Sequence, residues 1–252
     1  MGSAVAWHLY MANIRRIFML EIADPLAVRR EVSFCEAVHQ GRKEVEGVKA
    51  RLGKNLAGIK KCWADGEIAV VVDTRWRMLE NIRADVLVDA ILAKKNLGTT
   101  RKDASLVIGL GPGFRAGDDV HMVIETNRGH HLGRIITSGF AEANTGIPGS
   151  IAGYAAERVL RAQGCGKFKA YKKIGDPVKK NDIIGTVGNL EVKAMISGVL
   201  RGLIRSGSEV GRGLKIGDID PRAEAEYCYM ISEKARAIGG SVLEAICREF
   251  NR

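Results

Sequence analysis

Three apolar runs, each ending near a polar or glycine residue, constrain the fold of this chain more than any other feature. They are EIAVVVD (67–73), ADVLVDAIL (84–92) and SLVIGLG (105–111). Continuous β-branched runs of this length are typical of parallel strands that are buried on both faces. Helical or irregular connections separate them, and this alternation predicts an α/β fold with a Rossmann-like parallel sheet layer.

The pattern changes after residue 164. Segment 165–220 has closely spaced glycines and short β-branched runs, which predict a small all-β module. Residues 222–251 return to a helical pattern with a break at Gly239-Gly240. We therefore expect an α/β domain over 1–164, the β module over 165–220, and a C-terminal helical segment over 221–252 that packs back on the α/β domain.

Two further helices are predicted from their ends. The amphipathic stretch LAVRREVSFCEAVHQG is expected to stop at Gly41, and a helix over 150–163 is expected to begin at Ser150 and stop at Gly164.

The N-terminal residues match part of a dinucleotide-binding βαβ unit. Gly2 stands where its last glycine would be, an apolar helix follows, and the short strand 17–20 ends at the acidic Glu21. The first strand and the first two glycines have no counterpart, so we expect the first strand of the sheet to be missing. An ordinary N-terminal helix and strand fits the same residues.

The chain is basic, but its charge is uneven. The net charge is +10, and segment 160–216 alone carries twelve Lys and Arg against four Asp and Glu. Without interleaved aromatics or a nucleic-acid motif, a nucleic-acid partner is not favoured. An acidic partner protein, an anionic cofactor or a solvated basic surface each fits.

Cysteine usage and hydropathy bear on the cellular compartment expected for this protein. The five cysteines are scattered and none has C-x-x-C spacing, which argues against a disulfide framework and against a zinc site. No apolar run approaches the ~20 residues of a membrane helix, and no export signal is evident. We expect a cytoplasmic protein with no membrane partner; a homo-oligomer is compatible with the sequence.

The stretch VIGLGPGFRAGDDVHMVIETNRGHH (107–131) holds most of the candidate site residues. Glycines that follow a strand can present backbone N–H groups to an anion, and ligands of open α/β sheets bind at the carboxyl ends of strands. We therefore assign cofactor binding to Gly109, Gly111, Gly113 and Phe114. A purely structural turn is an open alternative.

Two polar clusters follow this loop. Asp118, Asp119 and His121 could do acid–base work or bind a cation. Arg128 could clamp a phosphate in a bidentate manner, with support from Glu125, Thr126, Asn127, Gly129 and His130. A solvated hairpin tip explains the second cluster equally well. The two turns lie at opposite ends of VHMVIE, which makes one shared pocket awkward, and no catalytic residue is assigned.

The β module resembles the barrel-sandwich hybrid fold of lipoyl and biotinyl carriers, through GDPVKKNDIIGTV and AMISGVLRGLIRSGSEVGRGLKIGDI. The resemblance implies a carrier lysine at a hairpin tip. Here the expected tip is Gly188-Asn189, and Lys193 lies farther along the strand. We therefore expect neither lipoate nor biotin on this chain.

Over nearly its whole length, the chain resembles the accessory proteins of selenium-dependent molybdenum hydroxylases, distant relatives of the xanthine dehydrogenase accessory proteins. The motifs are EIADPLAVRREVSFCEAV, VIGLGPGFRAGDDVHMVIETNRGHHLGRII and ISGVLRGLIRSGSEVGRGLKIGDIDPR. The resemblance implies a maturation role, a molybdopterin-type or nucleotide cofactor, and a hydroxylase apoenzyme or a sulfur or selenium donor protein as partner.

Two functions of other classes remain open. One is an NAD(P)-binding oxidoreductase that uses Gly2 and Glu21. The other is a non-catalytic scaffold that joins proteins through the basic β module.

Overall fold

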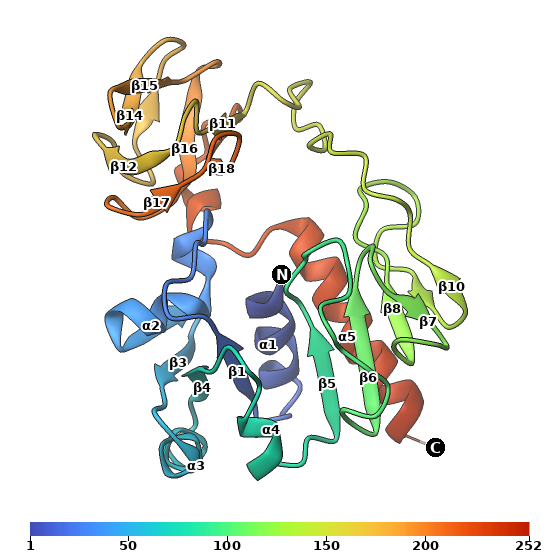
Figure 1. The fold of residues 1–252 in the computed structure, drawn as a ribbon. Coiled ribbons are helices and arrows are strands. Elements are labelled where there is room, and N and C mark those ends of the chain that lie inside the picture. Colours follow the sequence, from blue (N-terminus) through green and yellow to red (C-terminus); the bar gives the residue numbers. More distant parts are fainter. Residues whose placement is uncertain (252) are drawn as a thin grey trace. The chain divides into compact units, whose positions relative to one another are not determined.

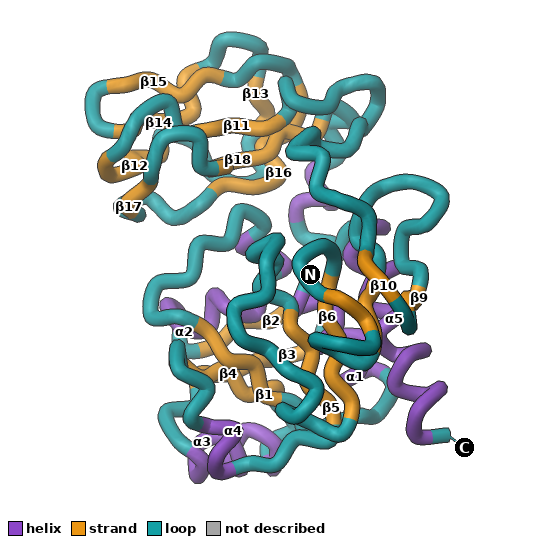
Figure 2. Tube along the Cα trace, turned by 45° about the vertical axis from the view of Figure 1, so that its right-hand side comes forward, coloured by secondary structure: helices purple, strands orange, loops and turns teal. Residues whose placement is uncertain are grey.

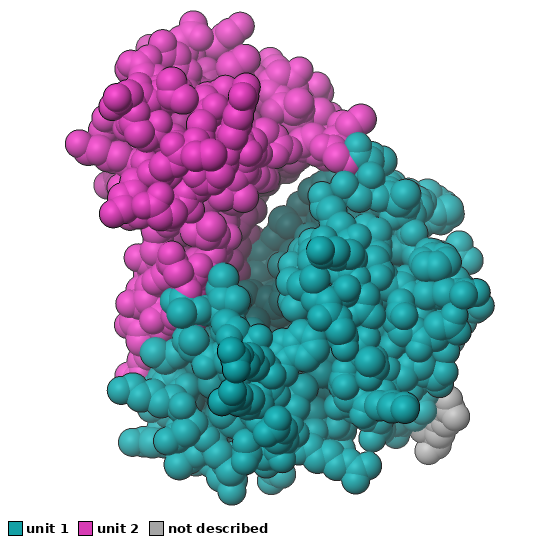
Figure 3. Space-filling view, viewed as in Figure 1, with its two compact units in different colours: residues 1–23, 48–145, 231–252 teal, residues 24–47, 146–230 magenta. Residues whose placement is uncertain are grey.

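The computed structural model describes residues 1–251 and divides the chain into two compact units. Unit 1 combines residues 1–23, 48–145 and 231–252, and unit 2 combines residues 24–47 and 146–230 (Figure 3). Each unit is therefore assembled from separated stretches of chain.

The first sheet of unit 1 is parallel, with β4 between β1 and β3. Its strands within unit 1 are β1 (Phe18–Glu21), β3 (Val48–Leu52) and β4 (Ile68–Val72). Helix α3 (Leu56–Ala64) begins at Asn55, whose side chain accepts a hydrogen bond from Gly58 N at 2.9 Å. It covers one face of β4 through Ile59 and Cys62, and the short α4 (Met78–Asn81) follows. The predicted strand 67–73 is confirmed as β4.

The second sheet of unit 1 has the order β5–β6–β8–β9. Strands β5 (Val86–Asp89), β6 (Leu106–Leu110) and β8 (Met122–Ile124) are parallel, and β9 (Ile135–Ile136) is antiparallel. A separate small pair joins β7 (Arg115–Ala116) to β10 (Gly139–Phe140). The predicted strands 84–92 and 105–111 are thus confirmed as β5 and β6.

Two helices pack on this second sheet. Helix α1 (Gly2–Met11) and the C-terminal helix α5 (Glu233–Phe250) contribute Val5, Leu9, Ile238 and Val242 to one core with β6 (Figure 1). Helix α5 runs through Gly239-Gly240 without a break. A Cβ at Gly239 would lie only 2.5 Å from the His8 side chain of α1. The glycine is there for close helix packing rather than for a helix stop.

Strands β1 and β5 belong to different sheets and are not hydrogen-bonded to each other. Their side chains are half-buried, apart from the buried Asp89, while β6 is completely buried. Unit 1 is thus a mixed α/β structure whose two sheets are built mainly from parallel strands.

Unit 2 contains two antiparallel sheets that pack face to face, in the orders β11–β18–β16–β13 and β15–β14–β12–β17 (Figure 2). The core between them includes Leu160, Phe168, Ile184 and Leu200. The strands are β11 (Val159–Arg161), β12 (Gly166–Ala170), β13 (Pro177–Val178), β14 (Ile183–Val187), β15 (Leu190–Lys193), β16 (Gly198–Leu203), β17 (Glu209–Val210) and β18 (Lys215–Asp220). The expectation of an all-β module is confirmed at this level.

The rest of unit 2 is largely irregular. It contains the 3-10 turns η1 (Arg30–Val32), η2 (Phe34–Glu36) and η3 (Ala225–Cys228), helix α2 (Ala37–Gln40) and strand β2 (Arg42–Val45). Segment 24–47 is tied to the end of β16, where Leu203 N donates to Val28 O at 2.8 Å. The long helix expected before Gly41 is reduced to η1, η2 and α2, although Gly41 does end α2 with a φ of 78°.

The predicted helix over 150–163 is wrong. Residues 151–158 form turns, with positive φ at Ala152 and Gly153, and β11 follows. Val159 and Leu160 pair with β18 and bury their side chains, so sheet pairing outweighs the local helical pattern. Residues 24–47 and 146–164, placed in the α/β domain by sequence, pack in unit 2, and the C-terminal helix packs in unit 1.

Among residues 1–251, no helix is both long enough and apolar enough to cross a membrane.

Candidate functional site

The carboxyl ends of β5, β6 and β8 lie at one edge of the second sheet, because these strands are parallel. The residues found there are Asp89, Gly111 and Glu125. Gly111 N donates to Ile124 O at 2.9 Å, so the glycine loop and the polar segment after β8 are neighbours. The sequence made a shared pocket for the two turns awkward, but residues 115–121 return the chain to the other end of the sheet before β8 begins, so the two turns follow neighbouring strand ends.

The glycines of the loop are required by its own packing. A Cβ at Gly109 would lie 2.5 Å from the buried ring of Phe114, and one at Gly113 would lie 2.6 Å from Lys95 N. At Gly111, with a φ of 77°, a Cβ would overlap the side-chain oxygen of Thr126. The structural explanation that the sequence left open therefore accounts for these three glycines without a ligand.

Glu125 and Thr126 are buried behind the edge. The Glu125 carboxylate accepts hydrogen bonds from Asn127 N and Glu142 N, both at 2.7 Å. Asp89 has a similar environment, because it accepts from Thr99 Oγ1 at 2.6 Å and from Ile91 N at 3.0 Å. Both carboxylates hold loops in place through hydrogen bonds from neutral donors.

The exposed part of the edge carries ion pairs. Arg128 NH1 lies 2.6 Å from Glu233 Oε1 at the start of α5, and the Arg128 side chain is 27% exposed. His131 Nδ1 lies 3.0 Å from Glu142 Oε1. Asn127 also donates to Glu142, and these two hydrogen bonds lower the pKa of that carboxyl below its usual value.

Next to these ion pairs lies an open depression of about 500 Å³, lined by His130, His131, Leu132, Gly133, Arg134 and Ser241. The rings of His130 and His131 meet edge to face, with centroids 5.5 Å apart. Gly129 supplies the turn before them with a φ of 143°.

Asp118, Asp119 and His121 lie at the opposite, amino end of the sheet. His121 Nδ1 accepts a hydrogen bond from Val107 N at 2.9 Å, which requires a neutral ring. Burial, followed by the charge of Arg101, lowers the pKa of His121. Asp119 accepts from Arg115 N at 2.8 Å, and Asp118 pairs with Arg115 at 2.8 Å. These three side chains fix a turn, and the structure does not bring them together with the Arg128 segment.

The two N-terminal candidates lie near the carboxyl ends of β1 and β5. A Cβ at Gly2 would lie 3.3 Å from Ala90 Cβ, just beyond β5, and 3.6 Å from Met19 in β1. Glu21 ends β1, and burial raises the pKa of its carboxyl. The first turn of α1 therefore lies beside the end of β5 and the Met19 side chain of β1.

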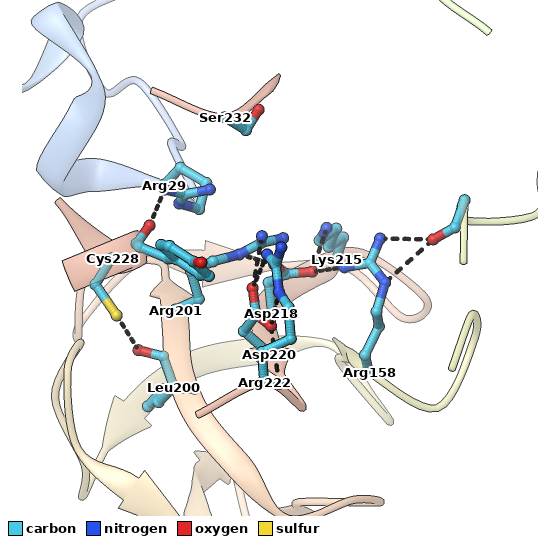
Figure 4. A network of polar contacts seen from close by, with 12 residues as sticks. Arg29, Arg158, Leu200, Arg201, Lys215, Asp218, Asp220, Arg222, Cys228 and Ser232 are labelled. Atoms are coloured by element: carbon cyan, nitrogen blue, oxygen red, sulfur yellow. Dashed lines mark hydrogen bonds and ion pairs between the residues drawn. The ribbon is translucent and has the colours of Figure 1, made fainter. Parts of the chain in front are cut away.

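The β module holds a polar network that sequence reasoning missed (Figure 4). Asp218 and Asp220 alternate with the core residue Ile219 on β18, so they lie on the face away from the core. Arg201 donates to both carboxylates at 2.9 Å. The only sequence signal is the alternation GDID after a run of basic residues.

Further cations complete the network. Arg158 bonds Asp218 and the carbonyl oxygen of Gly149, Lys215 Nζ lies 3.2 Å from Asp218, and Arg222 NH2 lies 2.7 Å from Asp220. Burial favours a raised pKa for Asp218, but Lys215, Arg201 and Arg158 outweigh it and hold this pKa below its usual value.

The hairpin between β14 and β15 turns at Gly188 and Asn189, as predicted, with a φ of 57° at Gly188. Lys193 lies at the far end of β15 and pairs with Glu191 at 2.8 Å. The absence of lipoate and biotin stays a prediction.

The described cysteines are free thiols, and Cys35, Cys62 and Cys228 are buried. Residues 1–251 contain no group of three His, Cys, Asp or Glu side chains arranged to hold a metal ion.

Comparison with known proteins gives one extended similarity. No protein-family model matches the chain. It is 48% identical over 245 residues to YqeB of Escherichia coli (strain K12), a protein described as uncharacterized. The match covers 97% of this chain and 45% of that protein, so the chain spans less than half the length of this relative.

Solved structures are similar over a smaller part. An aspartoacylase family protein from Mesorhizobium loti matches 34% of this chain and 27% of its own, with 12% identity and a TM-score of 0.24. The ectoine utilization protein EutE (DoeB) from Ruegeria pomeroyi, in a product-bound structure, matches 34% of this chain and 28% of its own, with 16% identity and a TM-score of 0.24. TM-scores this low carry no conclusion about fold or activity.

Proposed function

We propose that this chain is a cytoplasmic accessory protein for the maturation of a selenium-dependent molybdenum hydroxylase. In this role it binds an anionic cofactor of the molybdopterin or nucleotide type and a partner, which is the hydroxylase apoenzyme or a sulfur or selenium donor protein. The sequence motifs described above support the pathway. The finer fold belongs to the same proposal: unit 1 is Rossmann-like, and the β module of unit 2 is a barrel-sandwich hybrid.

One observation carries the cofactor part of the proposal. In unit 1 the first turn of α1 lies beside the carboxyl end of β5, and Glu125–Arg128 follow the parallel β8 at its carboxyl end. A helix N-terminus favours anions, and the carboxyl edge of a parallel sheet is where α/β proteins bind nucleotides. The site would be built around Arg128, with Asn127 and His130 beside it.

Arg128 is engaged by Glu233, so an incoming anion must compete with that carboxylate. Exchange of one partner for another costs little when the existing ion pair is partly exposed, since such pairs contribute ~0–1 kcal/mol. A charged hydrogen bond to the cofactor contributes ~1.5–3 kcal/mol, which predicts about 10- to 100-fold weaker binding for Arg128→Ala.

Equilibrium titration with molybdenum cofactor tests this proposal. Arg83→Ala is the matched control, because Arg83 is an exposed arginine of unit 1 that does not line the depression. The proposal expects weaker binding for Arg128→Ala alone. Wild-type binding no tighter than that of Arg128→Ala would overturn it.

A second candidate function is NAD(P) binding for oxidoreduction, and the position of Gly2 and Glu21 favours it. An acidic residue at the end of the second strand of a βαβ unit bonds the ribose of a dinucleotide. Titration with NAD(H) and NADP(H) tests it: binding that falls in Glu21→Gln supports this function, and no measurable binding excludes it.

A further inference from the structure

We propose that unit 2 carries a second anion site, specific for a phosphate-type oxyanion, above Arg201 and formed by Arg29, Lys215 and Arg222. This site goes beyond the proposed function and does not rest on it. All of its residues belong to unit 2, and none belongs to the candidate site of unit 1.

The first argument is the balance of charge. Five cationic side chains gather around the two carboxylates of Asp218 and Asp220: Arg29, Arg158, Arg201, Lys215 and Arg222. Even without Arg222, which donates to Asp220 through both Nε and NH2, the other four cations outnumber the two carboxylates by two positive charges. Burial of like charges together is costly unless a counter-charge is present.

The second argument is how the cations are used. Arg158 and Arg201 are each 7% exposed, and their guanidinium groups are directed at Asp218 and Asp220. They form the floor of the network. A bulge in β16 aims Arg201 at this face, because the register with β18 shifts between Leu200 and Gly202.

Arg29 and Lys215 have donors to spare, and Lys215 and Arg222 face solvent. Arg29 donates through NH2 to the carbonyl oxygens of Tyr227 and Met230, at 2.7 and 2.9 Å, and its Nε is buried without a partner. Lys215 has one hydrogen bond, to Asp218, although an ammonium group offers three donors. The side chains of Lys215 and Arg222 are 40% and 38% exposed, so an ion can reach them from solvent.

The third argument is that this arrangement disfavours the charged forms of Arg29 and Lys215. Burial, followed by the positive charge of Arg201, lowers the pKa of Arg29 to about 10. Burial also lowers the pKa of Lys215, despite its carboxylate neighbour. A bound anion would favour the charged forms of both side chains and so raise both pKa values.

The chemistry of these donors selects the ligand class. Arginine presents planar paired donors that match phosphate oxygens, and lysine adds a compact point charge. Figure 4 shows Arg29, Arg201 and Lys215 arranged along one side of the network, where a tetrahedral oxyanion could accept from several donors at once. The ligand is therefore a phosphate or the phosphate group of a small molecule.

Isothermal titration of the whole chain with inorganic phosphate and with pyrophosphate tests this site, in chloride buffers of matched ionic strength. Lys215→Gln and Arg222→Gln are the key variants, because both side chains are partly exposed. Arg29 is left intact, since its loss would also release the Tyr227 and Met230 carbonyls. Lys193→Gln is the control, as it removes the same charge from an exposed lysine of unit 2.

We expect saturable binding of one phosphate-type ion, weakened about tenfold in each key variant, as for loss of one charged hydrogen bond, and unchanged in Lys193→Gln. No saturable heat beyond that of chloride would overturn the proposal. Equal weakening by Lys193→Gln would also overturn it, because that result indicates general charge attraction. Arg128→Ala leaves this binding intact, so failure here and failure of the cofactor site in unit 1 are distinguishable.

Discussion

The two units bury their carboxylates in different ways. In unit 1, Asp89 and Glu125 lie at or just beyond strand ends and accept hydrogen bonds from backbone N–H groups and a hydroxyl. In unit 2, Asp218 and Asp220 lie within a strand and are held by arginine and lysine side chains. In unit 1, neutral donors fix loops at the edge of a sheet. In unit 2, charged donors form a network of ion pairs on one face of a sheet, and each ion in it is stabilised by its charged neighbours.

This difference predicts different vulnerabilities. Loss of a neutral hydrogen bond leaves an unpaired dipole, but loss of one ion from a buried group leaves whole charges without a partner. The units can be followed separately, because Trp7, Trp63 and Trp76, which are all of the tryptophans in the chain, belong to unit 1. Hydrogen exchange of β16 and β18 peptides reports on unit 2.

Asp218→Ala should have the largest effect. It leaves Arg158, Arg201 and Lys215 without their shared carboxylate, and removal of one partner from a buried ion group costs ~3–5 kcal/mol. We expect faster exchange in β16 and β18 with little change in tryptophan fluorescence. Asp24→Ala is the control, since that side chain is 69% exposed. A loss below ~1 kcal/mol, typical of a surface pair, would contradict this view of the network.

Gly111→Ala should be the next largest, and it acts on unit 1. A left-handed residue with a Cβ costs ~1–2 kcal/mol, and overlap with Thr126 adds ~1–3 kcal/mol of overpacking. Urea unfolding followed by tryptophan fluorescence measures the loss.

Gly139→Ala is the matched control, with a φ of 90° and nothing within 4 Å of an added Cβ, so it should show the backbone cost alone. The double variant Gly111→Ala/Thr126→Ala should recover part of the loss. Equal costs for Gly111→Ala and Gly139→Ala would show that loop packing does not require the glycine.

Acidification should change the stability contributed by the titrating groups in opposite directions in the two units. The pKa values of Asp218 and Asp220 are lowered in the folded state, so below the usual value of 3.8 the unfolded chain binds more protons. The contribution of both groups is therefore present above that pH and is lost as pH falls through the folded pKa values.

In unit 1 the pKa of Glu21 is raised above 4.5, so protonation of that group favours the folded state as pH falls. Exchange measured from pH 5 to pH 3 should thus rise in β16 and β18 before it rises in β6. The reverse order would show that the ion network does not govern the acid stability of unit 2.

The strands of unit 1 were predictable because their signal is local. The apolar runs became β4, β5 and β6, of which β6 is completely buried, β4 is buried up to its last residue and β5 is mostly half-buried, and the runs are readable from residue type alone. The helix expected over 150–163 failed because β11 is defined by its pairing with β18, which lies far away in the sequence. Local propensity cannot represent such a partner.

The candidate site was only partly predictable for the same reason. Gly111, Thr126 and Arg128 were recognised as neighbours of a strand end, but the partner of Arg128 is Glu233, more than a hundred residues away. Asp118, Asp119 and His121 were grouped with them because they are close in sequence, although a parallel connection carries them to the other end of the sheet. The charged side chains of the unit 2 network come from four separated places in the sequence, so no single segment predicts it.

The smallest expected effect concerns the ion pair of Arg128 and Glu233. Its side chains are 27% and 58% exposed, and exposed pairs contribute ~0–1 kcal/mol, so Arg128→Ala should barely change the stability of unit 1. A double-mutant cycle with Glu233→Ala, measured by tryptophan fluorescence in urea, gives the coupling energy. Addition of salt should reduce it further, because the pair is open to solvent. A coupling of ~3 kcal/mol would instead place this pair in the same class as the Asp218 network. Arg128 would then be a structural residue. Unit 1 would also depend on an ion pair, and the contrast between its neutral hydrogen bonds and the ion network of unit 2 would no longer hold.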